Sequence, residues 1–281
     1  AQMKKIVFVP SGGLGNRMKA ISAAILLGRA CGSELTVKWF QDWGMGCRFS
    51  DLFCPIALDH VSVQEGTWFD KLTTDRPRRH NLYIPALYEC LRYRRRMNEL
   101  GTAKGVEQQF NFATWAKGHD VWLSSYTYFM AKDIPADAFD CFRPIKALQE
   151  RIDRQALRLG QKCMGVHIRR TDNAKAIADS PTEAFIKRMK QESDDTIFYL
   201  ATDSEDVKRQ LRGIFGDSRI ITSQSKADRG SVSGMQDALV ELYTLGRCGH
   251  ILGSSFSTFA MTAAAVGRAH FECISVSAAR Q

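Results

Sequence analysis

The sequence lacks several patterns that would assign a protein to a class directly. None of its eight cysteines forms a C-x-x-C pair with another, which argues against a zinc site or a dithiol redox motif. Several lie in apolar runs, where a reduced thiol acts as a small hydrophobic side chain, so a reducing compartment is favoured over a disulfide framework. No apolar run reaches the roughly 18 residues of a membrane-spanning helix, and there is no internal repeat or low-complexity tract.

The start of the sequence carries no secretory signal. The run KKIVFVPSGG reads directly as a strand followed by a turn. We therefore expect a cytoplasmic protein of bacterial type, with at most a peripheral contact to a membrane, or a lumenal protein if the chain has been trimmed from a longer one.

The composition is that of a globular protein with an excess of positive charge. Hydrophobic residues make up 44% and charged residues 25% of the 281 residues, a length that suits one large domain or two ordinary ones. The net charge of +9 and a pI near 9.2 suit an anionic partner, such as a nucleotide, a nucleic acid, an acidic glycan or a membrane surface. The charge alone does not choose among these partners.

The first part of the chain opens with a β-loop-α-β pattern, the unit of a parallel sheet. An apolar strand, Ile6–Val9, leads through a glycine-rich turn into a helix predicted over Arg17–Cys31, and Gly32 is a typical helix-ending residue. The alternating run Glu34–Trp39 predicts the next strand.

The second half of the chain alternates strands and helices. Residues 143–160 predict a charged crossover helix, which places two domains at 1–145 and 146–281. Apolar runs after it predict four strands: Lys162–Ile168, Thr196–Ser204, Arg219–Thr222 and His250–Ser254. In the first helix between them, Ser180 is expected as the N-cap and Pro181 as the first helical residue. The alternation predicts an α/β fold with a parallel, doubly wound sheet.

Polar residues gather where these predicted strands end. Arg169 and Arg170 follow the first strand, Asp203 the second, and Ser254 with Ser255 the fourth. Parallel α/β sheets bind ligands beyond the carboxyl ends of their strands, so these residues form a candidate site. An arginine–aspartate ion pair within a turn, and capping of the helices that follow, explain the same residues, and both interpretations stay open.

The sequence GVHIRRTDN, residues 165–173, is the most distinctive part of this edge. Alternate strand side chains face opposite sides, so His167 and Arg169 share one face and Arg170 takes the other. An arginine fork matches phosphate oxygens and keeps its charge, which suits Arg169 for a diphosphate. Arg170 is then the residue that ties down the loop, through Asp172. A hydrogen-bonded core histidine is the plainer interpretation of His167.

A second candidate loop, SGGLGNRM at residues 11–18, follows the first strand. It resembles a phosphate-binding glycine loop, but Met18 stands where the last glycine of G-x-G-x-x-G would fall. The G-K-[ST] ending of a P-loop is also missing, so generic nucleotide loops are poor matches. The turn still brings Asn16 and Arg17 to the end of the strand.

Taken in order, GGLGNRM, GVHIRRTD, YLATDS and ILGSSFSTFAMTAA resemble the fucosyltransferase superfamily, which includes α1,2- and α1,6-fucosyltransferases and protein O-fucosyltransferases. HIRRTD is the most specific of these motifs and is similar to the α1,6 type. GGLGN is similar to the α1,2 type and to the G-x-G-N loop of the O-fucosyltransferases. Residues 40–150 carry no such resemblance.

The resemblance implies an architecture and a reaction. The fold would consist of two Rossmann-like domains in a GT-B-like arrangement, with the acceptor side at 1–145 and the GDP-sugar site at 146–281. The reaction would be an inverting, metal-independent transfer of a sugar, fucose by resemblance, from a GDP-sugar to a hydroxyl of a glycan or protein. The sequence contains no D-x-D triplet, the usual metal–diphosphate signature of the other large glycosyltransferase fold, which agrees with a site that needs no metal.

The resemblance also implies roles for single residues. Arg169 is similar to the arginine that grips the β-phosphate, and His167 to a histidine near the guanosine. Glu241 falls where α1,6 enzymes place an acidic residue that reads guanine, although a solvated helix face also explains it. Asn16 matches the asparagine of the G-x-G-N loop, which reaches the donor from the other domain. The implied donor-binding residues are Gly13, Gly15, Asn16, His167, Arg169, Arg170, Asp203, Glu241, Ser254, Ser255, Ser257 and Thr258.

The catalytic base is where the sequence departs from the family pattern. The α1,6 enzymes carry a glutamate a few residues after the arginine pair, and NAKAIADSP offers none here. Asp179 is the nearest carboxylate, while Asp172, an acidic residue of the first half, or no dedicated base at all are the alternatives. Asn173 also replaces a lysine. The candidate catalytic residues are Arg169, Asn16, Asp172 and Asp179.

Two other functions compete with a transferase. The missing glutamate is compatible with a non-catalytic family member that binds a GDP-sugar or a glycan. The basic runs Arg76–His80 and Leu91–Met97 would suit a nucleic-acid or anionic-polymer binding module. No RNP-type aromatic pattern or recognition helix supports that module, so we expect no nucleic-acid partner. A solvated helix face, an acidic acceptor or an anionic membrane surface explains the same basic residues.

Overall fold

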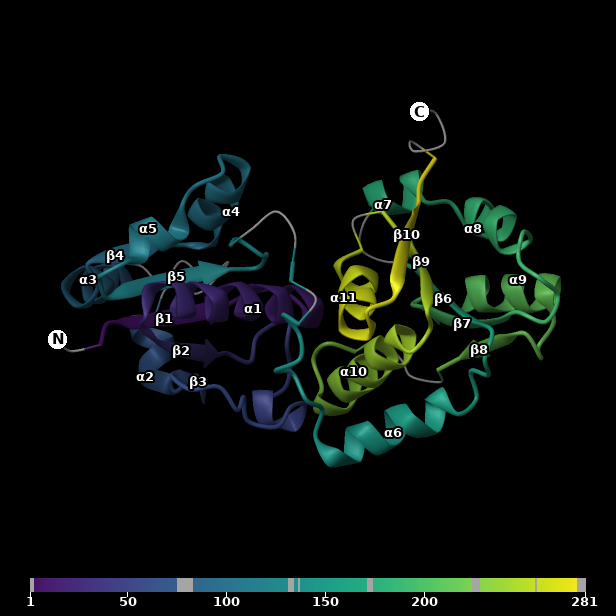
Figure 1. Cartoon of the computed structure of the whole chain (residues 1–281), viewed down its shortest axis with the longest axis horizontal. Coiled ribbons are helices and arrows are strands. Elements are labelled where there is room, and N and C mark those ends of the chain that lie inside the picture. The colour runs from purple at the N-terminus through teal and green to yellow at the C-terminus, as the bar shows by residue number, and fades with distance from the viewer. Residues whose placement is uncertain are drawn as a thin grey trace. The chain divides into compact units, whose positions relative to one another are not determined.

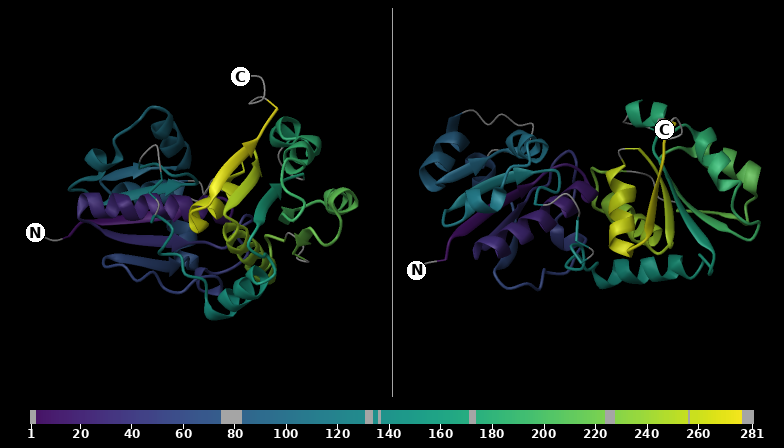
Figure 2. Two further views of the ribbon diagram at one scale, coloured as in Figure 1. Left: turned by 45° about the vertical axis from the view of Figure 1, so that its right-hand side comes forward. Right: turned by 45° about the horizontal axis from the view of Figure 1, so that its top comes forward.

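The computed structural model describes residues 3–74, 83–130, 134–135, 137–170, 174–223, 228–255 and 257–276. The chain separates into two compact units (Figures 1 and 2). Unit 1 consists of Ala1–Ile145 with Arg229–Met235, and unit 2 of Lys146–Asp228 with Gln236–Gln281. Within the described ranges, no helix is long and apolar enough to cross a membrane.

Unit 1 is built on a five-stranded sheet in the order β3-β2-β1-β5-β4, in which every pairing is parallel. Its strands are β1 (Lys5–Pro10), β2 (Glu34–Trp39), β3 (Val61–Glu65), β4 (Arg95–Met97) and β5 (Val121–Ser125). Its helices are α1 (Leu14–Cys31), α2 (Trp68–Thr73), α3 (Tyr83–Arg92), α4 (Glu99–Glu107) and α5 (Phe112–Ala116), with a 3₁₀ turn at Phe49–Asp51. The strand order reverses between β1 and β5, so the switch point of this sheet lies where the glycine loop leaves β1.

Helix α1 begins earlier than the sequence pattern predicted. Gly13 is its N-cap in an extended conformation, and the Gly13 carbonyl accepts the Arg17 N–H at 3.0 Å, so the first turn already contains the second half of the glycine loop. The predicted end is correct: Gly32 is the C-cap in the left-handed region at φ 61°. The glycine loop is therefore the N-terminus of a long helix.

Unit 2 is built on a second five-stranded parallel sheet, in the order β10-β9-β6-β7-β8. Its strands are β6 (Cys163–Ile168), β7 (Ile197–Thr202), β8 (Ile220–Thr222), β9 (His250–Ser254) and β10 (His270–Ile274). Its helices are α6 (Lys146–Ala156), α7 (Ala174–Asp179), α8 (Thr182–Met189), α9 (Glu205–Phe215), α10 (Val232–Gly246) and α11 (Thr258–Gly267), and of α10 the part from Gln236 onward belongs to this unit. The chain winds from β6 out to β8 and then returns to β9 on the other side, so the switch point lies between β6 and β9.

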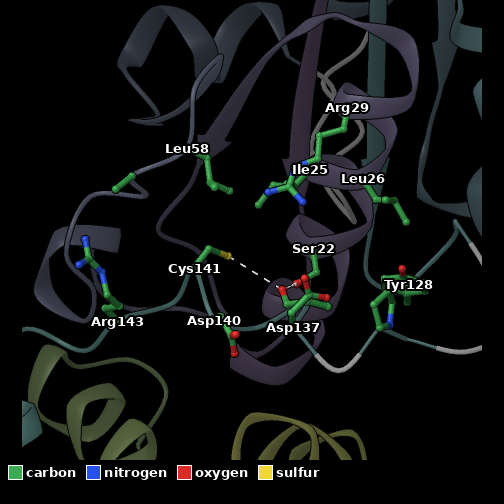
Figure 3. Close-up of a pocket in the computed structure, with 13 residues that line it drawn as sticks. Ser22, Ile25, Leu26, Arg29, Leu58, Tyr128, Asp137, Asp140, Cys141 and Arg143 are labelled. Atoms are coloured by element: carbon green, nitrogen blue, oxygen red, sulfur yellow. Dashed lines mark hydrogen bonds between the residues drawn. The ribbon is translucent and has the colours of Figure 1, made fainter.

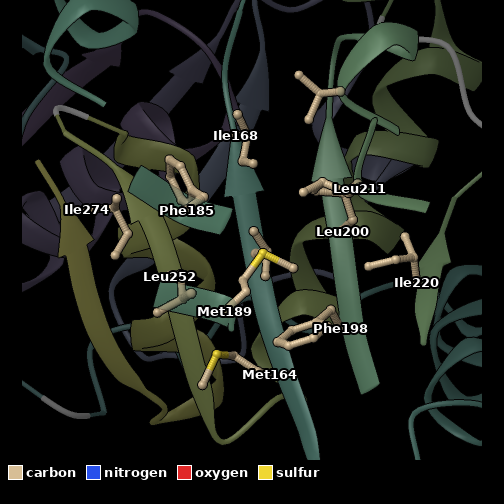
Figure 4. Close-up of a cluster of buried hydrophobic side chains, with 12 residues drawn as sticks. Met164, Ile168, Phe185, Met189, Phe198, Leu200, Leu211, Ile220, Leu252 and Ile274 are labelled. Carbon is tan, nitrogen blue, oxygen red and sulfur yellow. The ribbon is translucent and has the colours of Figure 1, made fainter. Parts of the chain in front are cut away.

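The two faces of β6 pack against different helices, which makes this sheet doubly wound. Met164, Val166 and Ile168 alternate onto one face and pack with side chains of α8 and α9 (Figure 4). On the other face, a Cβ at Gly165 would lie 2.7 Å from a Leu245 methyl of α10, so the absence of a side chain lets this helix approach. Figure 1 shows α8 and α9 on one side of the sheet and α10 on the other. The predicted fold class is confirmed.

Several local features were missed or mispredicted. The edge strand β10, the short strands β3 and β4, and helices α2 to α5 and α7 had no counterpart in the sequence prediction. Ser180 is not the N-cap of α8, because Pro181 is the N-cap residue and helical geometry begins at Thr182. The Ser180 hydroxyl instead accepts a hydrogen bond from the backbone N–H of Ser255 at 2.8 Å.

Candidate functional site

The carboxyl ends of three neighbouring strands bring the predicted residues of unit 2 together. His167 of β6 pairs with Ala201 of β7 on one side and with Gly253 of β9 on the other. Residues that directly follow these positions therefore share one edge of the sheet, at the switch point between β6 and β9. Arg169, Arg170, Asp203, Ser254 and Ser255 all fall there.

His167 is buried at this edge, with a defined partner on each side. Its Nδ1 lies 3.0 Å from the Ser257 hydroxyl, and its ring stacks on Phe259 at 5.1 Å between centroids. Burial and then the positive charge of Arg169 lower the pKa of His167 to about 4, while Asp203 acts in the opposite sense. The imidazole is therefore neutral at physiological pH and offers one donor and one acceptor nitrogen.

The two adjacent arginines have different environments. The Arg170 guanidinium donates to the Arg169 carbonyl at 2.8 Å, to the Ser180 carbonyl at 3.0 Å and to the Thr182 hydroxyl at 2.8 Å. Its backbone N–H donates to the Asp203 carboxylate at 2.8 Å. Arg170 therefore joins β6, the start of α8 and the end of β7, which is a structural role. The predicted partner Asp172 lies outside the described residues.

Arg169 follows β6 directly, and its side chain is half-buried. Its backbone N–H points to the Ser254 hydroxyl at 3.4 Å, and that hydroxyl lies 3.5 Å from the His167 carbonyl. Ser254 thus spans the switch point between β6 and β9. The backbone of Arg169 is thus tied to this junction, and the Arg169 charge is close enough to His167 to lower the pKa of that ring.

The start of α11 forms a further part of this edge. Ser257 is its N-cap and accepts the Ala260 N–H at 3.2 Å, and the helix has no acidic residue in its first turn. Thr258 is the first helical residue and is partly exposed. Helix N-termini present N–H groups and a partial positive charge, so this end suits an anionic group. Ser255 is fixed at the loop before it through Ser180.

Glu241 of α10 is half-buried, so the solvated-face interpretation is wrong. Its carboxylate accepts a hydrogen bond from the Ser223 hydroxyl at 2.6 Å. Burial raises the pKa of Glu241 to about 7, and the nearby carboxylates Asp237 and Asp203 act in the same direction, against Ser223 and Lys208. The carboxyl group thus titrates near neutral pH and shares an electrostatic environment with Asp203 of the site.

Of the two aspartates predicted as catalytic bases in unit 2, Asp179 is the one that lies within the described residues. It ends α7 and accepts a hydrogen bond from the Ser275 hydroxyl at 2.8 Å, just beyond β10. Its carbonyl accepts the Val276 N–H at 2.8 Å. Asp179 is therefore anchored at the carboxyl end of β10, two strands away from β6 and so about 10 Å along the sheet edge.

The glycine loop of unit 1 presents an open helix start. Gly12 has φ 81°, and a Cβ there would lie 2.9 Å from the Asn16 amide nitrogen. Gly13 makes no side-chain cap, and Gly15 is buried inside the first turn of α1. Asn16 is half-buried, and its side-chain amide has no hydrogen-bond partner among the described residues. The loop thus leaves N–H groups and one amide available to a ligand.

Arg17 in the same loop turns inward. Its guanidinium is fully buried and donates to the Gly12 carbonyl at 2.9 Å, the Phe40 carbonyl at 2.7 Å and the Asp42 carboxylate at 2.7 Å. It also lies over the Trp39 ring at 4.7 Å. Arg17 therefore holds the glycine loop onto the chain after β2 and is occupied by the protein itself. The sequence analysis did not identify Asp42 as the ion-pair partner of Arg17, because the two residues are 25 positions apart and only the fold brings them together.

A cavity of about 390 Å³ lies elsewhere in unit 1, between α1 and the chain near Asp137 (Figure 3). Ile25 and Leu58 give it an apolar wall, while Arg29 and Asp137 supply charges. The Tyr128 hydroxyl at its edge is buried without a hydrogen-bond partner among the described residues. None of the predicted site residues lines this cavity.

No cluster of histidine, cysteine, aspartate and glutamate among the described residues has the geometry to hold a metal ion. The charged side chains at or near the edge of unit 2 are those of Arg169, Arg170, Asp203 and Glu241. The Arg169 guanidinium suits an anionic group, and a carboxylate such as Glu241 suits the hydrogen-bond donors of a base edge.

No family model matches the sequence, and no curated protein matches it. Solved structures similar to this chain include several fucosyltransferases. NodZ from Bradyrhizobium is 18% identical, with a TM-score of 0.67 over 94% of this chain and 93% of that one, and NodZ α-1,6-fucosyltransferase with GDP gives 0.68. A mutant of Arabidopsis thaliana FUT1 with GDP is 14% identical, with a TM-score of 0.63 over 97% of this chain and 70% of that one. POFUT1 with GDP-fucose is 12% identical, with a TM-score of 0.58 over 96% and 98%.

These similarities establish the fold. The chain has the α/β fold of these structures, with two parallel sheets, so the fold that the motif resemblance implied is confirmed. Because 94% or more of this chain is covered, the similarity extends over most of residues 40–150, which carried no recognisable motif.

Proposed function

We propose that the protein is a GDP-fucose-dependent fucosyltransferase that acts on a hydroxyl of a glycan or protein. The proposal rests mainly on the arrangement at the switch point between β6 and β9. There Arg169 and the start of α11 lie at the same edge of the sheet. Structures with this fold include NodZ soaked with GDP-fucose and POFUT1 in complex with GDP-fucose. The cytoplasmic location expected from the sequence is part of the same proposal.

The proposed chemistry is a single displacement with inversion. The acceptor oxygen forms a bond to the anomeric carbon while the bond from that carbon to the diphosphate breaks, and GDP leaves with the electron pair. Negative charge grows on the diphosphate, and without a metal it must be met by protein donors. Arg169 and the N–H groups at the start of α11 supply such donors in a fixed arrangement.

The remaining residues are assigned by their geometry and the resemblance. A carboxylate at Glu241 accepts from the N1–H and N2–H₂ edge of guanine, which adenine does not offer. Neutral His167 supplies a hydrogen bond without adding charge. For Asn16 of unit 1, the resemblance assigns a contact with the donor, and its unpartnered amide suits that role.

The proton of the acceptor hydroxyl needs a recipient. Asp179 is a carboxylate anchored by Ser275 at the same edge of the sheet and is the described candidate. Asp172 is the alternative. The departure from the α1,6 pattern at this point favours a second candidate function, a non-catalytic protein that binds GDP-sugar.

Two measurements test the proposal. Thermal shift with GDP, GDP-fucose, UDP and ADP should show stabilisation by the guanosine compounds alone. Transfer from labelled GDP-fucose should fall by roughly two to three orders of magnitude in Arg169→Ala, because one preorganised donor to the leaving group is lost. Arg209→Ala, on an exposed position of α9, is the matched control and should keep full activity.

The outcomes separate the candidate functions. Guanosine-specific stabilisation without transfer to any glycan or peptide would favour the non-catalytic binding protein. Normal turnover by Arg169→Ala would contradict the assignment of the site. Salt-sensitive binding to arbitrary DNA, without any response to GDP, would favour the anionic-polymer module.

A further inference from the structure

Helices α2 and α3 of unit 1 carry a cluster of exposed apolar side chains. Trp68 is 73% exposed, Leu87 64% and Leu91 81%, and these are among the most exposed large hydrophobic side chains of the described residues. The cluster, called here the α2–α3 patch, consists of Trp68, Phe69, Leu72, Leu87 and Leu91. Single exposed apolar residues are normal on a protein surface, but a contiguous group marks an interaction surface.

The patch is continuous across the two helices. Trp68 contacts Phe69 edge to face with ring centroids 6.0 Å apart, and Phe69 contacts Tyr88 of α3 in the same way at 6.0 Å. Trp68 and Leu72 lie one turn apart on α2, as do Leu87 and Leu91 on α3, so each pair points to one side of its helix. The aromatic contacts therefore join two apolar helix sides into one surface.

Basic residues border this surface at the end of α3. Arg92 ends the helix, and Arg94, Arg95 and Arg96 follow it on the way into the edge strand β4, all of them exposed. Arg92, Arg94 and Arg95 have no carboxylate within ion-pair distance among the described residues. Their positive charge is thus directed to solvent.

The acidic residues that the structure describes in this region are not available to balance that charge. Within residues 66–74 and 83–98 the only acids are Asp70 and Glu89. Asp70 pairs with Lys38 at 3.1 Å and caps the start of α2, while Glu89 is buried. The surface that remains combines exposed tryptophan, phenylalanine and leucine with arginines that form no ion pair within the described part of the chain.

We propose that the α2–α3 patch docks the protein peripherally onto an anionic lipid bilayer. Tryptophan, phenylalanine and leucine insert at the boundary between headgroups and acyl chains, where a side chain can be apolar on one side and wet on the other. Arginines beside them interact with anionic headgroups. The charge is the reason for choosing a bilayer, since a second copy would bring its own arginines against these.

The test uses the full chain and sucrose-loaded vesicles that can be sedimented. Vesicles of phosphatidylcholine and phosphatidylglycerol should carry the protein into the pellet, and phosphatidylcholine vesicles should do so weakly. Binding should decrease at about 1 M salt, where the Debye length falls to about 3 Å. Trp68→Ser and Leu91→Ser should each lower the partition coefficient roughly tenfold, and Arg92→Glu combined with Arg95→Glu should remove the preference for the anionic lipid.

Matched controls lie elsewhere on the surface. Leu157 is 85% exposed next to α6, and Arg209 is exposed on α9, so Leu157→Ser and Arg209→Glu change the same residue types outside the patch. Both should sediment like the wild type. Thermal unfolding of every variant should stay within a few degrees of the wild type, because exposed positions contribute little to stability.

Three results would overturn the proposal. The first is an absence of vesicle binding by the wild type at low salt. The second is an equal loss of vesicle binding in the control variants, which would show that binding does not depend on the α2–α3 patch. The third is self-association of the wild type that Leu91→Ser abolishes while vesicle binding is absent, since the patch would then bind a second copy. None of these outcomes depends on fucosyl transfer.

Discussion

The Ser257 hydroxyl joins two elements of the site, because it caps α11 through the Ala260 N–H at 3.2 Å and lies 3.0 Å from Nδ1 of His167. His167 belongs to β6, and the ring is neutral because burial and Arg169 lower its pKa to about 4. One hydroxyl thus fixes both the start of the helix and the orientation of an imidazole at the switch point.

Replacing this hydroxyl should therefore cost more than an ordinary helix cap. Ser257→Ala removes a cap, a loss of about 1 kcal/mol in the free energy of unfolding, and also leaves the buried His167 nitrogen without a partner, which adds about 1–3 kcal/mol. Ser204→Ala is the matched control, since Ser204 caps α9 through the Val207 N–H and contacts no histidine. Chemical denaturation measures both variants, and equal losses would contradict the proposed link.

Glu241 should make the stability of the protein depend on pH. Its folded-state pKa of about 7 lies above the ordinary value of 4.5, so between these pH values the folded state holds a proton that the unfolded chain has released. Its contribution to stability is therefore lost as the pH rises from about 4.5 to 7. Glu241→Gln should gain about 1–3 kcal/mol in unfolding free energy relative to the wild type between pH 5 and pH 8. Denaturant titrations at the two pH values measure this, and a constant difference between the two proteins would contradict it.

The same titration should control donor binding in the opposite direction. If the ionised carboxylate of Glu241 accepts hydrogen bonds from guanine, donor binding requires the deprotonated form of Glu241. With a pKa of about 7, this form predominates at pH 8 and is the minor form at pH 6. The affinity for GDP-fucose should then decrease roughly tenfold over this range. GDP-fucose is the better probe than GDP, because its diphosphate has no terminal phosphate that titrates near pH 6. Calorimetry should show weaker and nearly pH-independent binding for Glu241→Gln.

The parts of the structure that could be predicted are those with a regular local signal. In unit 2 the strands and helices alternate, and in unit 1 Gly32 ends α1 as its sequence position indicates. The parallel-sheet rule then placed Arg169, Asp203 and Ser254 on one edge without any knowledge of their contacts. Edge strand β10 was missed because it is only partly buried and its residues do not alternate cleanly.

Long-range pairings were the part that sequence reasoning could not supply. Ser180 has the residue type and position of an N-cap, yet its hydroxyl accepts a hydrogen bond from the backbone N–H of Ser255, 75 positions away. Arg17 follows Asn16 in a loop that suits a phosphate, but it is buried against Phe40 and Asp42. In both cases local chemistry allows two partners, and the three-dimensional packing decides between them.

The glycine loop allows a direct test with two adjacent positions. Gly12 has φ 81°, in the left-handed region, and a Cβ there would lie 2.9 Å from the Asn16 amide nitrogen. Gly12→Ala should lower the unfolding free energy by about 1–2 kcal/mol and displace Asn16, so both stability and donor affinity should fall. Gly13 has φ −75°, and a Cβ there meets nothing within 4 Å, so Gly13→Ala should fold normally.

The comparison between these two variants separates strain from loss of a ligand contact. Thermal unfolding reports the strain, and calorimetry with GDP-fucose reports the effect on Asn16. If Gly12→Ala is as stable as Gly13→Ala, the left-handed conformation is not required by the loop. If Gly12→Ala is destabilised but binds GDP-fucose with wild-type affinity, Asn16 does not contact the donor, and its assigned role is wrong. Asn16→Ala, which leaves the backbone unstrained, should weaken binding without the stability loss of Gly12→Ala.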